Sequence, residues 1–345
     1  MLDTARFILS KSKALEKYGF VKELCDEVSY SLKTNYEVGK VLQDNTDSSF
    51  SVHSVNEIRR VDYPERVWYF SQAWDEPEMD LLFDGGVRRF VVDNISDLRV
   101  LLKFLEQRDD KIDLLLRMRL KENTVHTGKH YVYGMYSKQV NELIPKLRSN
   151  DKIRKLGVHF HRKSQNVSEW SLKYELEQCL SEVTLKKIDI VNIGGGIPGQ
   201  YKNFRQAVLD SIITRIKEFR EWLQGFGIKM IIEPGRFISA YCVELETTIK
   251  NIYDNNIIVN CSVYNGAMDT FVAHFRLLVK GELKQGEGQA YAIKGNTPCS
   301  MDLFRYRVYL DNPKVGDKII FENAGAYNFS TDFCSLEKLE TVVVN

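Results

Sequence analysis

The stretch Ile190-Val-Asn-Ile-Gly-Gly-Gly-Ile-Pro-Gly199 joins a short apolar run to three consecutive glycines. The apolar run predicts a buried strand, and the glycines predict a turn directly after it. Because glycines have no Cβ atoms, the backbone of such a turn can approach a ligand and offer its N–H groups to a phosphate. A tight turn without a ligand fits the same residues, so the interpretation depends on the rest of the chain.

The pattern of a strand followed by a helix repeats along the first two thirds of the chain. Strand-like runs occur at residues 28–32, 49–52, 67–70, 89–92, 113–118, 156–160, 189–193 and 229–232. Such alternation indicates parallel βαβ units, and eight units in about 220 residues match the size of a (β/α)8 TIM-like barrel. An open doubly wound sheet is the alternative, but its glycine turn would follow the first strand, and this one follows the seventh.

The alternation of strands and helices ends near residue 241. Short strand candidates lie at residues 243–248, 257–259, 275–279, 290–293, 307–310, 317–321 and 341–344, separated by turn signals such as Gly281, Gly286 and Asn312-Pro313. This pattern predicts a C-terminal all-β domain of the sandwich or Greek-key barrel type. A further short strand is expected at residues 6–10.

The composition excludes several classes of protein. The formal net charge of +1 shows no excess of basic residues of the kind that binds nucleic acid. No apolar run is long enough for a membrane span, and the first residues lack the apolar region of a signal peptide. The six cysteines are scattered without a CxxC pair, which argues against a zinc site and against a disulfide scaffold. We therefore expect a cytoplasmic protein without a bound metal.

Reactive residues follow several of the predicted strands at their carboxyl ends, where barrel enzymes place their active sites. Lys33 follows the first strand, His161 the sixth, Gly194–Gly196 the seventh, and the segment Glu233-Pro-Gly-Arg236 the eighth. Each also has a purely structural interpretation: a solvated lysine, a hydrogen-bonded loop histidine, and a Glu233–Arg236 ion pair. Together, a lysine, a histidine, a carboxylate and a phosphate cradle are the parts that a pyridoxal phosphate enzyme requires.

Over nearly its whole length the sequence resembles the fold type III pyridoxal phosphate-dependent decarboxylases, the ornithine/arginine/diaminopimelate group with an alanine-racemase-like barrel. The matching motifs are Tyr30-Ser-Leu-Lys-Thr-Asn35, Phe50-Ser-Val-His-Ser54 with Glu57, the glycine turn, Glu233-Pro-Gly-Arg236, Pro298-Cys-Ser-Met-Asp302 and Gly325-Ala-Tyr327. The resemblance implies a barrel at residues 11–240 and a β domain made of residues 1–10 and 241–345.

The resemblance also implies a role for each site residue. Lys33 would carry the cofactor through a Schiff base, His161 would stack on its ring, and Glu233 would pair with its ring nitrogen. Its phosphate would be held by the following residues: Ser164, Gly194, Gly195, Gly196, Gly235, Arg236 and Tyr327. Cys299 would protonate the substrate Cα from the partner subunit of a head-to-tail homodimer.

The sequence departs from the family pattern at several positions. Ser51 and Asn192 stand where the family has aspartates, and Arg162, Lys163 and Gln165 interrupt a glycine-containing segment after His161. Ser300 follows Cys299 where the family places an acidic residue that holds a distal substrate amine. Either Asp302 takes over this contact, or the substrate lacks the amine.

The sequence thus predicts decarboxylation of an amino acid. The substrate would be a basic amino acid, a polyamine precursor or a molecule with an aminocarboxypropyl group; diaminopimelate is disfavoured because no arginine motif for its second carboxylate is present. The alternatives are an amino-acid racemase, against which Glu233 and Cys299 argue, and a non-catalytic homologue that binds a partner, against which the retained cofactor residues argue.

Overall fold

The structure is a computed structural model that describes residues 4–120, 132–162, 166–202 and 207–345. The chain divides into two compact units. The barrel unit comprises residues 18–198 and 207–235, and the β unit comprises residues 1–17, 199–206 and 236–345. By these contacts residues 11–17, 199–202 and 236–240 group with the β unit, and the domain boundaries expected from the sequence stay a prediction.

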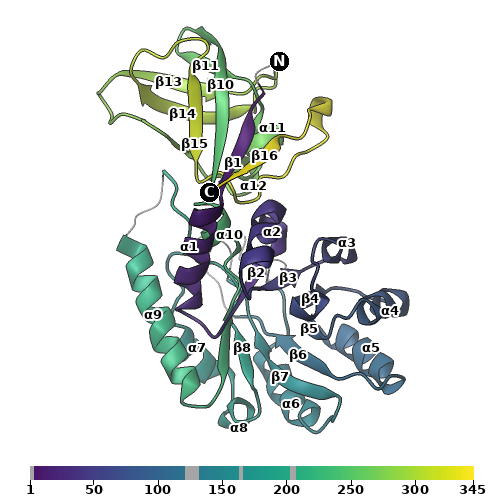
Figure 1. The fold of residues 1–345 in the computed structure, drawn as a ribbon. Coiled ribbons are helices and arrows are strands. Elements are labelled where there is room, and N and C mark those ends of the chain that lie inside the picture. Colours follow the sequence, from purple (N-terminus) through teal and green to yellow (C-terminus); the bar gives the residue numbers. More distant parts are fainter. Residues whose placement is uncertain (1–3, 121–131, 163–165, 203–206) are drawn as a thin grey trace. The chain divides into compact units, whose positions relative to one another are not determined.

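The barrel unit is built on a closed ring of eight parallel strands in chain order, and the predicted fold class is confirmed (Figure 1). The strands are β2 (Glu27–Ser31), β3 (Ser49–Val52), β4 (Val67–Ser71), β5 (Arg89–Val92), β6 (Ile112–Arg117), β7 (Ile153–His159), β8 (Ile190–Asn192) and β9 (Lys229–Ile232). The ring closes through β2 and β9, where Val28 pairs with Ile232.

Helices connect the strands, as the alternating pattern predicts. They are α2 (Tyr36–Asn45), α3 (Val55–Ile58), α4 (Glu76–Asp84), α5 (Ile95–Glu106), α6 (Ser137–Leu147), α7 (Leu172–Cys179), α8 (Glu182–Leu185) and α9 (Ala207–Gln224). Several begin at a capping side chain directly after a strand: Asn35 accepts hydrogen bonds from the first turn of α2, Ser54 of α3 and Asn94 of α5. These caps keep the strand-to-helix turns short and therefore fix the residues at the carboxyl rim.

The interior of the barrel contains an apolar core. Trp68, Val91, Leu115, Ile190 and Ile231 pack there from five different strands. At the amino ends of the strands, Glu27 Oε1 accepts hydrogen bonds from Ser49 Oγ (2.6 Å), Trp68 Nε1 (3.0 Å) and Arg89 Nη1 (3.0 Å). This polar cluster ties four strands together at the end opposite to the reactive residues and is a stabilising feature.

The β unit holds one branched, eight-stranded mixed sheet. Its strands are β1 (Arg6–Ser10), β10 (Val243–Tyr253), β11 (Asn256–Val259), β12 (Leu278–Val279), β13 (Gln289–Lys294), β14 (Leu303–Leu310), β15 (Lys318–Glu322) and β16 (Glu340–Val344). The N-terminal strand β1 pairs with β10 and β16.

The predicted strands of this unit are present, but the unit is not purely β. It also contains the short helices α11 (Val263–Gly266) and α12 (Asp269–Val272). Helices α1 (Lys11–Lys22) and α10 (Gly235–Ser239) complete the set, with short 3₁₀ turns at Leu32–Thr34, Pro64–Arg66 and Phe333–Ser335. Among the described residues, the structure has no helix long and apolar enough to cross a bilayer and no group of side chains suited to hold a metal ion.

Candidate active site

The barrel brings the reactive residues of four strand ends onto neighbouring strands, because β7, β8, β9 and β2 adjoin in the ring. Lys33 lies in the turn after β2, His161 follows β7, and Glu233 follows β9. Direct contacts join His161 and Glu233 to the glycine turn after β8: Gly195 N–H donates to His161 Nδ1 (3.1 Å), and Glu233 N–H donates to the Gly194 carbonyl (2.8 Å). The barrel unit thus brings together segments that the sequence predicts to share a site, and their roles toward a cofactor stay predictions.

Glu233 is a buried carboxylate that stays ionised. Its side chain is 4% exposed, Asn192 Nδ2 donates to its Oε1 (2.9 Å), and His159 Nε2 lies 3.5 Å from its Oε2. Burial by itself would raise the pKa of Glu233, but the neighbouring histidines and the Asn192 hydrogen bond lower it to about 2. A buried anion of this kind is suited to a cationic partner such as a protonated pyridine nitrogen.

Asn192 accounts for one departure from the family pattern. Its Nδ2 holds Glu233, and its Oδ1 accepts the N–H of Gly194 (2.8 Å). An aspartate could accept the Gly194 bond but would place a second carboxylate against Glu233. Asn192 therefore links the glycine turn to the carboxylate without charge repulsion.

The glycine turn needs its glycines for conformation and space. Gly194 and Gly196 have φ of +66° and +101°, and a Cβ on Gly194 would lie 2.6 Å from the Phe160 carbonyl oxygen. The N–H groups of Gly194 and Gly195 are both used inside the barrel, by Asn192 and His161. Their predicted contact with a phosphate stays a prediction, and Gly194 contributes to the site through its conformation.

Gly235 lies at a close approach between two strand ends. A Cβ on this residue would lie 2.3 Å from Thr34 Oγ1 and 2.9 Å from Ser31 Cβ. Thr34 is the residue after Lys33, and its hydroxyl is buried without a hydrogen-bond partner among the described residues. A glycine at position 235 is thus required for the turn that carries Lys33 to pack here. The Thr34 hydroxyl beside it is a polar group that could still form a hydrogen bond.

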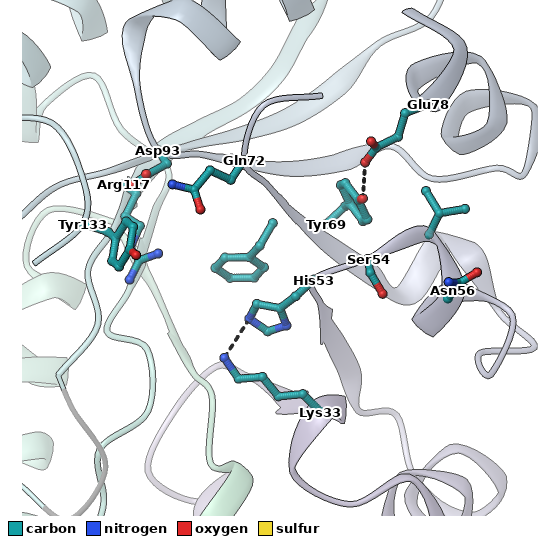
Figure 2. Close-up of a pocket in the computed structure, with 12 residues that line it drawn as sticks. Lys33, His53, Ser54, Asn56, Tyr69, Gln72, Glu78, Asp93, Arg117 and Tyr133 are labelled. Atoms are coloured by element: carbon teal, nitrogen blue, oxygen red, sulfur yellow. Dashed lines mark hydrogen bonds between the residues drawn. The ribbon is translucent and has the colours of Figure 1, made fainter. Parts of the chain in front are cut away.

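Lys33 opens into a pocket of about 580 Å³ at the carboxyl ends of β2 to β6 (Figure 2). The lining residues are Lys33, His53, Ser54, Val55, Asn56, Tyr69, Phe70, Gln72, Glu78, Asp93, Arg117 and Tyr133. Lys33 is exposed to this hollow, yet protein atoms surround it and desolvation lowers its pKa, with a smaller contribution from Arg117. A lowered pKa gives the lysine a larger neutral, nucleophilic fraction at neutral pH.

His161 is accessible to solvent on one side and enclosed by protein on the other. Desolvation by the enclosing atoms, together with the charges of Arg117 and Lys33, holds its pKa well below the ordinary value. The ring is therefore neutral at physiological pH, and its Nδ1 accepts the Gly195 N–H. A neutral ring fits the predicted role of stacking on an aromatic cofactor. Ser164, the predicted phosphate contact that follows it, lies outside the described residues.

Two predicted phosphate ligands belong to the β unit. Arg236 forms a bidentate pair with Asp269 (2.5 and 2.9 Å) and donates to Tyr201 Oη (2.8 Å). Its guanidinium also lies over the rings of Phe275 and Tyr327, at 4.4 and 5.1 Å from the ring centroids. The ion-pair partner of Arg236 is thus Asp269, and the contact of Arg236 and Tyr327 with a phosphate stays a prediction.

The loop with Cys299 and Asp302 also lies in the β unit. Cys299 is half-buried, and its Sγ lies 3.3 Å from Tyr264 Oη, a contact that raises the pKa of Tyr264 to about 12. Asp302 is 2% exposed and accepts hydrogen bonds from Val263 N, Thr297 N and Thr297 Oγ1. This carboxylate holds its own loop together, which argues against its predicted contact with a substrate amine.

Sequence reasoning missed four polar side chains at the rim: His53, Asp93, Arg117 and His159. Each follows or ends a barrel strand, so the criterion that found Lys33 and Glu233 would have found them too. His53 lies inside the quoted motif Phe50-Ser-Val-His-Ser54, and His159 lies in the strand-like run at residues 156–160.

The comparisons agree with this geometry. Residues 13–240 match the family model described as pyridoxal-dependent decarboxylase, pyridoxal binding domain. The chain therefore belongs to the pyridoxal-dependent decarboxylases, and pyridoxal phosphate is the cofactor of this class of lyase.

A Staphylococcus aureus relative, 2-[(L-alanin-3-ylcarbamoyl)methyl]-2-hydroxybutanedioate decarboxylase, is 24% identical over 88% of this chain and 83% of its own. Among solved structures, the Vibrio vulnificus lysine/ornithine decarboxylase is 21% identical with a TM-score of 0.82, covering 100% of this chain and 96% of its own. The Helicobacter pylori diaminopimelate decarboxylase is 20% identical with a TM-score of 0.84, covering 99% and 92%.

Proposed function

We propose that this chain uses pyridoxal phosphate, held at Lys33, to remove the α-carboxylate of an amino acid. The observation that carries the proposal is the buried, ionised Glu233 directly after β9, because β9 pairs with β2, the strand that precedes Lys33. When bound, the cofactor withdraws electrons from the substrate Cα, so that carbon dioxide can leave.

The residues of the chain fit this cofactor. Lys33 supplies a primary amine with a lowered pKa for the covalent bond, and Glu233 supplies a negative charge for the ring nitrogen. His161 supplies a neutral ring face, and the turn at Gly194–Gly196 would approach the phosphate. Arg236 and Tyr327 would add phosphate contacts from the β unit.

The proton steps fall to the side chains. Lys33 must give up a proton before its Nζ can form a bond and must take one up when it is released. After carbon dioxide leaves, Cα needs one proton, and the Cys299 thiol is the proposed donor. Because the family resemblance places this cysteine in the partner's active site, we propose a homodimer with shared sites. We also propose a cytoplasmic location.

For the substrate, we propose an amino acid whose side chain has no distal amine, ahead of the basic amino acids. Two observations support this order: Ser300 replaces the acidic residue after Cys299, and the carboxylate of Asp302 is already used by three hydrogen bonds. The Staphylococcus aureus relative is named for a substrate of the carboxylate-bearing kind.

Racemization is less well supported, because an enzyme of that class usually has an arginine beside the ring nitrogen where this chain has Glu233. A non-catalytic role is also disfavoured, because a binding protein has no need for the combination of Lys33 and Glu233.

Release of carbon dioxide from a panel of amino acids tests the proposal. The panel should contain ornithine, lysine, arginine, diaminopimelate and the substrate of the Staphylococcus aureus relative. Racemization of any of these without carbon dioxide release would contradict it.

A further inference from the structure

His53 makes a contact with Lys33 that none of the family-derived roles explains. Its Nε2 lies 3.2 Å from Lys33 Nζ, and Figure 2 shows the two side chains pointing toward one another in the pocket. His53 follows β3, the strand next to β2, so the two residues approach from adjacent strand ends.

The position of the His53 ring is fixed on several sides. One face stacks on Phe70, with ring centroids 5.0 Å apart and an interplanar angle of 19°. The backbone N–H of His53 donates to Glu57 Oε2 (2.6 Å), and the same oxygen lies 3.7 Å from the ring Nδ1. Glu57 is held in turn at the start of α3, where its N–H donates to Ser54 Oγ (3.3 Å).

Glu57 acts on the His53 ring through its charge, because the 3.7 Å between its Oε2 and Nδ1 is too long for a hydrogen bond. It is 6% exposed, and its pKa is lowered although burial opposes this, so it is an anion beside Nδ1. The negative charge favours the tautomer with the hydrogen on Nδ1. That tautomer leaves a lone pair on Nε2, the atom that faces Lys33 Nζ.

Burial lowers the pKa of His53, and the charge of Lys33 lowers it further, whereas Glu57 and Glu233 oppose the shift. The ring is therefore neutral at physiological pH, and its Nε2 lone pair can take a proton from Lys33, whose own pKa is lowered as well. Ser51 stands where the family has an aspartate, and its hydroxyl is hydrogen-bonded to Ser29 (2.8 Å) inside the barrel. This position therefore holds no carboxylate that could compete with His53 for the Lys33 proton.

We propose that His53 is a catalytic base that accepts the proton of Lys33 when the lysine forms a covalent bond and returns it when the lysine is released. In the forward step an N–H bond of Lys33 breaks and its electron pair stays on Nζ, while a new N–H bond forms at His53 Nε2. The resulting imidazolium lies beside the Glu57 carboxylate. This inference rests on the proposed function, in which Lys33 bonds to the cofactor.

The test measures the nucleophilicity of Lys33 without the cofactor. The full chain, dialysed against hydroxylamine to remove bound cofactor, is treated with p-nitrophenyl acetate between pH 6 and 9, and acetylation of Lys33 is followed by mass spectrometry of its peptide. The proteins compared are wild type, His53→Ala, His53→Gln and the control Arg59→Ala, an exposed residue at the end of α3. Glutamine keeps a hydrogen-bond acceptor but cannot take up a proton.

In both His53 variants Lys33 should be acetylated about 100- to 10,000-fold more slowly than in the wild type at pH 7, the range of general base catalysis. Free imidazole should restore the rate of His53→Ala, and Arg59→Ala should behave as wild type. A wild-type rate in His53→Gln would overturn the proposal by showing that the ring only positions the lysine, and a lack of imidazole rescue would overturn it as well. If the wild type bound no pyridoxal phosphate, the proposed function would fail, but the acetylation result would stand.

Discussion

Asn192 and Glu233 form a 2.9 Å hydrogen bond between two side chains that are almost completely buried, at 0% and 4% exposure. The same asparagine accepts the N–H of Gly194 through its other terminal atom. One amide thus connects the turn that should approach the phosphate with the carboxylate that should face the ring nitrogen. This connection makes the geometry of the two halves of the barrel site interdependent.

Replacing Asn192 should therefore destabilise the barrel. In Asn192→Ala the buried Gly194 N–H and Glu233 Oε1 both lose a partner, and we expect a loss of about 1–3 kcal/mol in the free energy of unfolding. Asn192→Asp keeps the Gly194 bond but repels Glu233, so its loss should shrink when either carboxyl is protonated. Urea denaturation at pH 3 and pH 8 measures both effects. Equal stability of the aspartate variant relative to wild type at the two pH values would contradict this account.

Glu233 should make stability depend on pH in the acid range. Its pKa falls from the ordinary 4.5 to about 2 on folding. The stabilisation is present above pH 4.5 and is lost as the pH falls from there toward 2. Glu233→Gln, which keeps an acceptor for Asn192, should lose on the order of 2–3 kcal/mol at neutral pH and approach the wild-type stability in acid. Denaturant titrations between pH 6 and pH 3 provide the comparison, and a constant difference would argue that Glu233 does not titrate as described.

Lys33 should destabilise the cofactor-free protein. Burial lowers its pKa from 10.5, so the folded chain binds this proton more weakly than the unfolded chain does. This loss of stability is present at neutral pH and disappears as the pH rises past 10.5. Lys33→Met should thus have a higher Tm than the cofactor-free wild type at pH 7, with a smaller difference at pH 10. It should also lose the visible absorption of the covalently bound cofactor and all decarboxylation. A lower Tm at pH 7 would show that the lysine stabilises the fold.

Asp302 should behave as a structural residue. Its carboxylate takes three hydrogen bonds, and Gly295 makes room for it, since a Cβ there would lie 2.1 Å from Asp302 Oδ1. Asp302→Ala should lower the free energy of unfolding by about 1–3 kcal/mol because buried donors lose their acceptor. If Asp302 instead bound the substrate, Asp302→Asn would raise KM for basic amino acids at unchanged stability. Steady-state kinetics and thermal unfolding of both variants separate these outcomes.

The shared active sites can be tested with two defective variants. Lys33→Ala should be inactive, and Cys299→Ala should be slowed at the protonation of Cα. In a mixture, subunit exchange produces a dimer with one site that has both intact residues, so activity above that of either variant should appear. Mixtures that gain nothing after proven exchange would show that Lys33 and Cys299 of the same chain work together, or that the chain is not such a dimer.

Most of the barrel could be predicted from the sequence because the signals for its strands and helices are local. Each strand is a short apolar run, and each helix has a periodic face and often a capping residue such as Asn35 or Asn94. The rule that parallel barrels collect function at the carboxyl ends of their strands then placed Lys33, His161 and Glu233 together. The β unit was less predictable, since its strand candidates could be found in the sequence but their pairing could not. The parallel pairs of β1 with β16 and of β11 with β13 depend on contacts far apart in the chain.

The sequence by itself determined the residue types of the site, their order along the chain and the family to which the chain belongs. Only the tertiary structure decided what each polar group faces: Asn192 faces Glu233, His53 faces Lys33, and Asp302 faces its own loop. The physical reason is that strand and helix signals are local, whereas the partner of a buried polar group is set by which strand ends the closed ring brings together. The chemistry of the site depends on those partners.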